Sequence, residues 1–250
     1  MNNSLPYVLV TGASSGMGKI IAINLSHRYN VVLHGRDEER LNQTKKECNQ
    51  ANDCLIWAFD LTKLDNLEEE LKYFMLNNTI SIAHFVHCAG YMKLLPIKMI
   101  SLENLNTSFQ TNIFSAALIM KVLTSIKANG KSLKSVVFIS SNISNRGAKA
   151  FSTYASTKGA LDSLMRCLAM ELAPRVRVNS VLPGAVKTEM TQAIFDDTQV
   201  ADKMNKSYPL GVGDPMDIFE IVDFLLSDKS RWITGQQFTV DGGRSVNIAE

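Results

Sequence analysis

Short apolar runs alternate with longer helical patterns along almost the whole chain, and this alternation constrains the fold more than any other feature. We predict strands in the apolar runs at residues 7–11, 30–34, 54–59, 82–88, 135–140, 177–182 and 237–240. Helical periodicity lies between them, at residues 17–27, 38–49, 64–76, 102–128, 153–173 and 216–226. Nearly continuous apolar strands indicate parallel strands covered on both faces. The sequence therefore predicts an α/β Rossmann fold, a doubly wound parallel sheet of about seven strands with helices on both faces.

A single domain accounts for this pattern. The chain has 250 residues, which is compatible with one α/β unit, and no repeat or linker-like segment interrupts it. We therefore expect residues 1–250 to form one Rossmann-type domain. Residues 188–215 lack clear periodicity and are long for a connection in a compact domain, which predicts a lid or binding loop.

Composition argues against several classes of protein. The formal net charge is +2 without a basic block, so we expect neither nucleic acid nor a membrane as a partner. The chain shows neither a secretory signal nor an apolar window long enough to cross a membrane. The four cysteines and four histidines have no metal-ligand spacing, so no metal site is expected. Unpaired cysteines suit a reducing compartment, and we predict a cytoplasmic protein.

A glycine-rich turn, TGASSGMG at residues 11–18, connects the first predicted strand to a helix. Glycines there let the backbone turn sharply and let a pyrophosphate approach the amides at the helix N-terminus, where the helix dipole favours negative charge. An ordinary strand-to-helix turn is the alternative, but the position after the first strand favours dinucleotide binding. The candidate cofactor-binding residues in this turn are Gly12, Ser14, Ser15, Gly16, Met17 and Gly18.

The residues after the second and third predicted strands bear on the choice of dinucleotide. Arg36 offers a bidentate cation for the 2′-phosphate of NADP, whereas an Asp37 carboxylate facing the ribose would favour NAD. Both could instead lie in a solvated turn. We favour NADP(H) over NAD(H). Asp60 and Leu61 are further candidate contacts, although Asp60 could cap the next helix instead of binding the adenine amino group.

Tyr154 and Lys158 carry the sharpest chemical signal. Residues four apart lie on one face of a helix, where the lysine charge would lower the tyrosine pKa from its ordinary value of about 10. Such a tyrosine can exchange a proton with a carbonyl or alcohol oxygen. Ser141 follows the fifth predicted strand, at the sheet edge where ligands bind. Its hydroxyl could stabilise a developing negative charge or could simply cap the strand end.

The glycine turn, the serine after the fifth strand and the YASTK segment at residues 154–158 together resemble the short-chain dehydrogenase/reductase family over essentially the whole chain. The resemblance implies an oxidoreductase that moves a hydride between NAD(P) and a carbonyl or secondary alcohol. It implies that Asn112 joins Ser141, Tyr154 and Lys158 as a catalytic residue by holding a water in a proton relay. It also implies cofactor contacts from Ala89, Gly90, Tyr154, Lys158, Pro183, Gly184, Val186 and Thr188.

The chain departs from the family pattern at three places. His87 and Cys88 replace the two asparagines of the family's NNAG segment, while Ala89 and Gly90 remain. Ser15 stands where NADP-using members often carry a basic residue. The segment at residues 209–213 lacks the arginine that many members have after the lid.

The region of residues 188–218 most resembles 3-oxoacyl-acyl-carrier-protein reductases, which implies a small-molecule or acyl-thioester carbonyl as substrate. Apolar side chains in this region could contact the substrate or simply pack the lid. They are Met190, Ile194, Phe195, Met204 and Tyr208. An acidic carrier would meet basic side chains, for which the candidates are Arg146, Lys149, Arg166 and Arg175. The alternatives are an NAD-dependent alcohol or sugar dehydrogenase and, in another class, a non-catalytic dinucleotide-binding redox sensor.

The resemblance also implies a homotetramer or a dimer. The predicted helix after Tyr154 is too widely apolar for one narrow stripe, which fits burial against a second subunit or deep burial in its own domain. The apolar residues are Leu161, Leu164, Met165, Leu168, Ala169 and Leu172.

Overall fold

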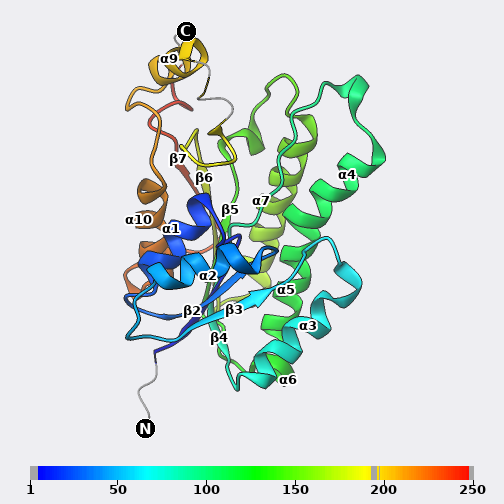
Figure 1. Ribbon diagram of the computed structural model, residues 1–250, viewed down its shortest axis with the longest axis vertical. Coiled ribbons are helices and arrows are strands. Elements are labelled where there is room, and N and C mark those ends of the chain that lie inside the picture. Colours follow the sequence, from blue (N-terminus) through cyan, green and yellow to red (C-terminus); the bar gives the residue numbers. More distant parts are fainter. Residues whose placement is uncertain (1–4, 193–195, 197, 248–250) are drawn as a thin grey trace.

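A seven-stranded parallel sheet forms the centre of the computed structural model, which describes residues 5–192, 196 and 198–247 (Figure 1). The strand order is β3-β2-β1-β4-β5-β6-β7, and each neighbouring pair is parallel. This architecture confirms the predicted doubly wound fold. The strands are β1 (Tyr7–Thr11), β2 (Asn30–Gly35), β3 (Cys54–Ala58), β4 (Ile82–His87), β5 (Ser135–Ile139), β6 (Arg177–Pro183) and β7 (Gln237–Val240).

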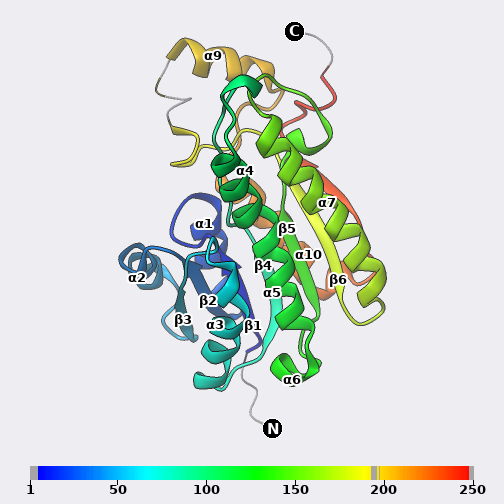
Figure 2. The same ribbon diagram turned by 90° about the vertical axis from the view of Figure 1, so that its right-hand side faces the viewer.

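Helices cover both faces of the sheet (Figure 2). One face is covered by α3 (Leu64–Asn77), α4 (Leu102–Phe109), α5 (Ser115–Thr124), α6 (Ile126–Asn129) and α7 (Ser152–Leu172). The other face is covered by α1 (Gly16–Leu25), α2 (Glu38–Glu47) and α10 (Pro215–Leu226), and α9 (Thr198–Ser207) lies in the predicted lid. Among the described residues, none of the helices combines the length and the apolar character that crossing a membrane requires.

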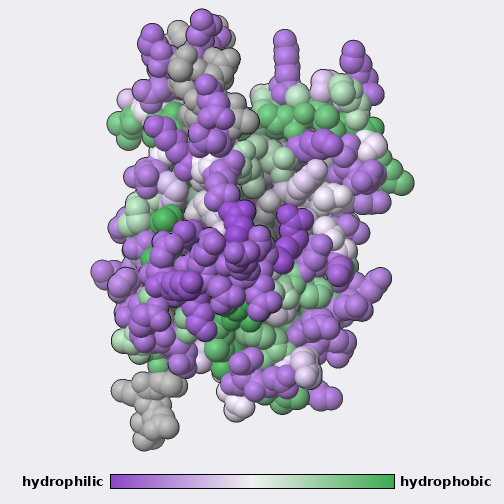
Figure 3. Space-filling view, viewed as in Figure 1, coloured by the Kyte–Doolittle hydropathy of each residue, from purple (hydrophilic) through white to green (hydrophobic). Residues whose placement is uncertain are grey.

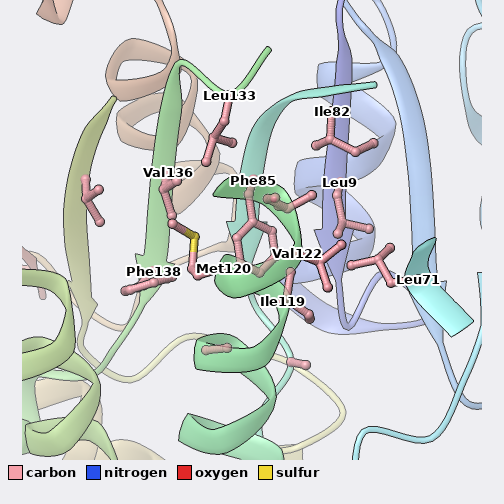
Figure 4. Close-up of a cluster of buried hydrophobic side chains, with 14 of the residues drawn as sticks. Leu9, Leu71, Ile82, Phe85, Ile119, Met120, Val122, Leu133, Val136 and Phe138 are labelled. Carbon is pink, nitrogen blue, oxygen red and sulfur yellow. The ribbon is translucent and has the colours of Figure 1, made fainter. Parts of the chain in front are cut away.

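Alternation along each strand divides the core into two clusters. Successive side chains of a strand point to opposite faces, so Phe85 and Phe138 belong to one cluster while Val86 and Val137 belong to the other. Figure 4 shows Phe85 between the strands and the side chains of α5, and its ring meets that of Phe138 edge to face. Only Leu41 and Thr44 of α2 are buried, and its outer surface is hydrophilic (Figure 3).

The predicted helix at residues 102–128 is interrupted in two places. A π-helical turn, Gln110–Phe114, separates α4 from α5. Ser125 then has an extended backbone, and its side chain accepts a hydrogen bond from the Ala128 amide to begin α6. Ser125 therefore acts as an N-cap, a preference that helical periodicity alone does not report.

The apolar residues of α7 pack within their own chain. Leu161, Met165 and Ala169 are buried in the core, and the other leucines of the helix contact the same cluster. Met170 is 77% exposed. Burial in its own domain accounts for Leu161, Met165 and Ala169, whereas the outer leucines stay partly exposed, and the implied oligomer stays a prediction.

Replacing Phe85 by alanine should lower the free energy of unfolding by about 3–5 kcal/mol, because it leaves a cavity in a close-packed core. Urea denaturation followed by circular dichroism measures this change. Leu76→Ala on α3 is the control, since Leu76 is 76% exposed and its truncation should change stability by less than about 0.5 kcal/mol. Equal losses in the two variants would contradict the core assignment.

Candidate active site

The glycine turn between β1 and α1 is shaped by close backbone contacts. Gly12 has a φ of +72°, and a Cβ there would lie 2.9 Å from the backbone of Ala89. A Cβ at Gly18 would lie 2.2 Å from the carbonyl oxygen of Gly12. Glycine is therefore required at both positions, because any side chain would force the turn away from the end of β4.

The N-terminus of α1 is open to an anion. Ser15 occupies the N-cap position without a side-chain capping bond, and the first turn contains no acidic residue. The amides of Gly16, Met17 and Gly18 lack helical partners because they belong to the first turn. Together with the helix dipole, these amides suit a pyrophosphate.

One cavity of about 610 Å³ extends along the carboxyl ends of the strands. This volume falls within the usual range for cofactor sites. Twelve of the predicted cofactor-binding residues line it: Gly12, Ser14, Ser15, Gly16, Met17, Gly18, Arg36, Asp60, Leu61, Ala89, Gly90 and Thr188. A dinucleotide fits these residues, because the open helix N-terminus and the ends of β2, β3 and β4 share one cavity.

Three predicted contacts at the end of β6 and just after it, Pro183, Gly184 and Val186, do not line this cavity. Gly184 is packed between Asp241 and Tyr208, and a Cβ there would lie 2.7 Å from Asp241. The side chain of Val186 is 4% exposed and belongs to the core. A contact from Pro183, Gly184 or Val186 would therefore come from this segment's backbone.

The residues after β2 and β3 bear on two alternatives left open by the sequence. The Asp37 carboxylate accepts a hydrogen bond from the Arg40 amide and caps α2, and both Arg36 and Asp37 line the cavity. Asp60 accepts hydrogen bonds from the amide and hydroxyl of Thr62, whereas Lys63 occupies the N-cap of α3. Asp60 thus stabilises a turn at the cavity and does not cap the helix.

Arg40 and Glu189 also line the cavity and were missed by the sequence analysis. Their side chains form an ion pair that joins α2 to the segment after β6. Arg40 lies in the first turn of α2, directly after the strand end that carries Arg36, and this position could have suggested it. Glu189 carries no comparable signal, because its partner is distant in sequence.

The end of β4 is held against β1 by the Thr11 side chain. Its hydroxyl accepts hydrogen bonds from the amides of Cys88 and Ala89, and it lies 3.0 Å from Nδ1 of His87. Burial lowers the pKa of His87 to about 3, so the ring is neutral. His87 and Cys88 replace the family's asparagines, yet Ala89 and Gly90 still line the cavity.

Ser141, Tyr154 and Lys158 meet beside this end of β4. Ser141 follows β5 and its hydroxyl accepts from the Ile143 amide at 3.4 Å, so the predicted capping role is present. Lys158 donates to the carbonyl oxygen of Ile139 at 2.8 Å, and its Nζ lies 5.6 Å from the ring centroid of Tyr154. The same Nζ is 3.7 Å from the Cβ position of Gly90, which connects these side chains to the cavity.

The electrostatics of Tyr154 differ from the prediction that Lys158 lowers its pKa. Burial raises the pKa of Tyr154 to about 12, although an interaction with the Ser141 side chain opposes the increase. Burial also lowers the pKa of Lys158 to about 8. Desolvation outweighs the expected attraction because the ammonium is directed at the Ile139 carbonyl. Tyr154 is therefore a neutral phenol that can donate a proton.

Asn112 lies in the π-helical turn and is fully buried. Its Oδ1 accepts from the Tyr91 amide at 2.6 Å, and its Nδ2 donates to the Tyr91 carbonyl and the Thr157 hydroxyl. The side chain therefore fastens the segment after β4 to α7. Its Oδ1 is 3.8 Å from the Cβ position of Gly90, which places it near Lys158.

Comparison with known proteins agrees with this arrangement. A family model described as enoyl-(acyl carrier protein) reductase matches residues 12–245. Bovine L-xylulose reductase (Bos taurus) is 32% identical over 238 residues, covering 94% of each chain. The chain belongs to the short-chain dehydrogenase/reductase family.

Two further relatives extend the comparison. Diacetyl reductase, (S)-acetoin forming, from Staphylococcus epidermidis is 30% identical over 94% of this chain and 96% of its own. A crystal structure of a short-chain type dehydrogenase/reductase from Mycobacterium ulcerans is 26% identical, has a TM-score of 0.87, and covers 99% of this chain and 92% of that one. This short-chain dehydrogenase/reductase is accordingly an oxidoreductase acting on alcohol or carbonyl groups, in a family that binds NAD(P)(H).

The predicted lid at residues 188–215 includes side chains that pack against the domain and side chains that line the cavity. Tyr208 accepts a hydrogen bond from the Ala185 amide and its ring contacts Gly184, so it packs the lid in place. Met190 is 51% exposed and lines the cofactor cavity. Met204 lies on α9, while the predicted substrate contacts Ile194 and Phe195 lie outside the described residues.

Gly18→Ala should weaken NADPH binding by at least about tenfold, because its Cβ would displace the Gly12 carbonyl and deform the turn. Fluorescence titration with NADPH measures the dissociation constant, and circular dichroism checks the fold. Gly147→Ala is the matched control, since a Cβ there meets nothing within 4 Å. Unchanged affinity in Gly18→Ala would remove the turn from the cofactor site.

Proposed function

We propose that this short-chain dehydrogenase/reductase reduces the carbonyl group of a small molecule with NADPH. The observation that carries the proposal is a neutral, partly buried Tyr154 beside Ser141 and Lys158, next to the cavity at Gly90. NADPH supplies the hydride when it is bound. Tyr154 gives the substrate oxygen a proton, and Ser141 orients and stabilises that oxygen.

Different residues around the cavity bind different parts of the cofactor. The amides at the start of α1 hold the pyrophosphate, and Lys158 holds the nicotinamide ribose through its ammonium group. Asn112 keeps the segment after β4 in register with α7, which maintains the position of Gly90. The family's water-holding role for Asn112 stays part of this proposal.

Protonation states support the reducing direction. With a pKa of about 12, Tyr154 keeps its proton throughout the physiological range and is ready to act as an acid. With a pKa of about 8, Lys158 is an ammonium below that pH and loses its charge above it. The rate of reduction should therefore decline as the pH rises through about 8.

The proposed preference for NADP depends on which charged side chain after β2 meets the adenosine ribose. Arg36, Asp37 and Arg40 all line the cavity, but Asp37 caps α2 and Arg40 pairs with Glu189, so we expect Arg36 to be the cation that meets the ribose. A guanidinium fork binds phosphate with two parallel hydrogen bonds, which favours the 2′-phosphate.

Small oxygenated ketones are the substrate class that we favour. The relatives are named as reductases of L-xylulose and diacetyl. Both compounds are small and carry oxygen on the carbon next to the ketone. An NAD-dependent sugar dehydrogenase is equally compatible with these relatives, and the cofactor assay below separates it.

A 3-oxoacyl thioester is the second candidate substrate. The matching family model is described as an enoyl-(acyl carrier protein) reductase, which shares the carrier though not the reacting bond, and Arg146 and Lys149 are exposed between β5 and α7. Arg166 does not belong with them, because it lies twelve residues after Tyr154 on α7, roughly 18 Å along the helix. Arg175 follows the far end of α7.

Tyr154→Phe should lower kcat/KM by about 10²- to 10⁴-fold while NADPH still binds, because the variant lacks the proton donor. The assay follows nicotinamide absorbance with NADPH and NADH against L-xylulose, diacetyl, acetoacetyl thioesters and secondary alcohols. Tyr73→Phe on α3 is the control, since Tyr73 is 63% exposed. Full activity in Tyr154→Phe would contradict the mechanism, and tight NADPH binding without turnover of any substrate would favour a redox sensor.

Arg36→Ser should weaken NADPH binding by at least about tenfold and leave NADH binding unchanged, because only NADPH carries the 2′-phosphate. Isothermal titration with both dinucleotides measures the two affinities. Lys46→Ser removes a positive charge from the exposed end of α2 and serves as the control. An equal loss for both dinucleotides would mean that Arg36 does not discriminate between them.

A further inference from the structure

Asp162 is a buried acid one helical turn after Lys158 on α7. Asp162 is 2% exposed and Lys158 is 3% exposed. Neither carboxyl oxygen of Asp162 has a hydrogen-bond partner within the described part of the chain. A buried carboxylate without hydrogen bonds is costly, and an apolar side chain at this place would avoid the cost. Its presence calls for an electrostatic explanation.

Two buried serine hydroxyls lie between α7 and the sheet. Ser180 lies on the face of β6 that α7 covers, and its hydroxyl also lacks a partner among the described residues. Ser140 at the end of β5 donates to the Lys158 carbonyl at 3.3 Å. The apolar cluster of Leu161 and Met165 closes this region from solvent. Charge on Asp162 is therefore poorly screened and acts strongly on its neighbours.

The other titratable groups near Lys158 are uncharged at pH 8. Burial raises the pKa of Cys88 and of Tyr154 to about 12, and it lowers the pKa of His87 to about 3. For Lys158, burial lowers the pKa, while Cys88 and Asp162 oppose that change. Because the thiol keeps its proton, Asp162 is the remaining acidic side chain among the groups that oppose the effect of burial on Lys158.

The elements packed against α7 bring no competing charge to this place within the described residues. Arg177 begins β6, but its guanidinium donates to the carbonyl oxygens of Leu225, Leu226 and Ser227. Glu103 on α4 is exposed. The acidic side chain that acts on Lys158 therefore comes from α7 itself.

We propose that Asp162 is a positioning residue of the reaction, whose buried carboxylate holds Lys158 in the ammonium form that faces Tyr154 and the cofactor ribose. This role rests on the proposed function of Lys158. It extends the Tyr154–Lys158 pair by one helical turn, since residues four apart share a helix face. Without the carboxylate, Lys158 loses its proton at a lower pH.

Nuclear magnetic resonance of lysine side chains tests the proposal without cofactor or substrate. In protein labelled with ¹³C at lysine Cε, Lys158 is assigned as the signal lost in Lys158→Met. Asp162→Asn should move its titration midpoint down by about one pH unit. Glu171→Gln removes an exposed acid from the same helix and should leave the midpoint unchanged. Asp162→Leu should give the same shift as Asp162→Asn and serves if the amide variant does not fold.

The pH dependence of kcat/KM supplies the second readout. The decline in reduction rate at alkaline pH should begin about one pH unit lower in Asp162→Asn than in wild type and Glu171→Gln. Coincident titration midpoints in wild type and both Asp162 variants would overturn the inference even if the enzyme is active. Failure of the wild type to reduce any carbonyl counts against the proposed function and leaves the titration result standing.

Discussion

The site depends on the close approach of β1 to β4 at the carboxyl edge of the sheet. Gly12 has no room for a Cβ against Ala89, and the Thr11 hydroxyl accepts from two amides at the end of β4. The strand order reverses between these neighbours, so the chain leaves them toward opposite faces of the sheet. The divergence opens the cavity, and the glycine turn places the start of α1 within it.

Burial, more than ion pairing, sets the chemistry of the site. Tyr154, Cys88 and His87 are all driven toward their neutral forms by desolvation. Lys158 is the exception that keeps a charge near neutral pH, with a carbonyl oxygen as its hydrogen-bond acceptor. A neutral acid beside a buried cation is an arrangement suited to giving a proton to a carbonyl oxygen as it gains negative charge.

Helix capping distinguishes the roles of the polar residues that precede the helices. Asp37 and Arg36 are adjacent and both line the cavity, but Asp37 also caps α2. Ser15 and Ser125 both precede helices, but only Ser125 makes a side-chain capping bond. The start of α1, unlike that of α2, thus keeps its first amides open for a ligand at the cavity.

The sequence by itself determined the order of strands and helices, the glycine turn, and the pairing of Tyr154 with Lys158. These features follow from local periodicity and fixed helical spacing, which need no knowledge of distant residues. Tertiary structure alone decided that Tyr154 has a raised pKa, that Arg40 reaches Glu189, and that Asp162 is buried without a hydrogen bond. Each depends on desolvation or on contacts between segments far apart in the chain, and neither is encoded in a local pattern.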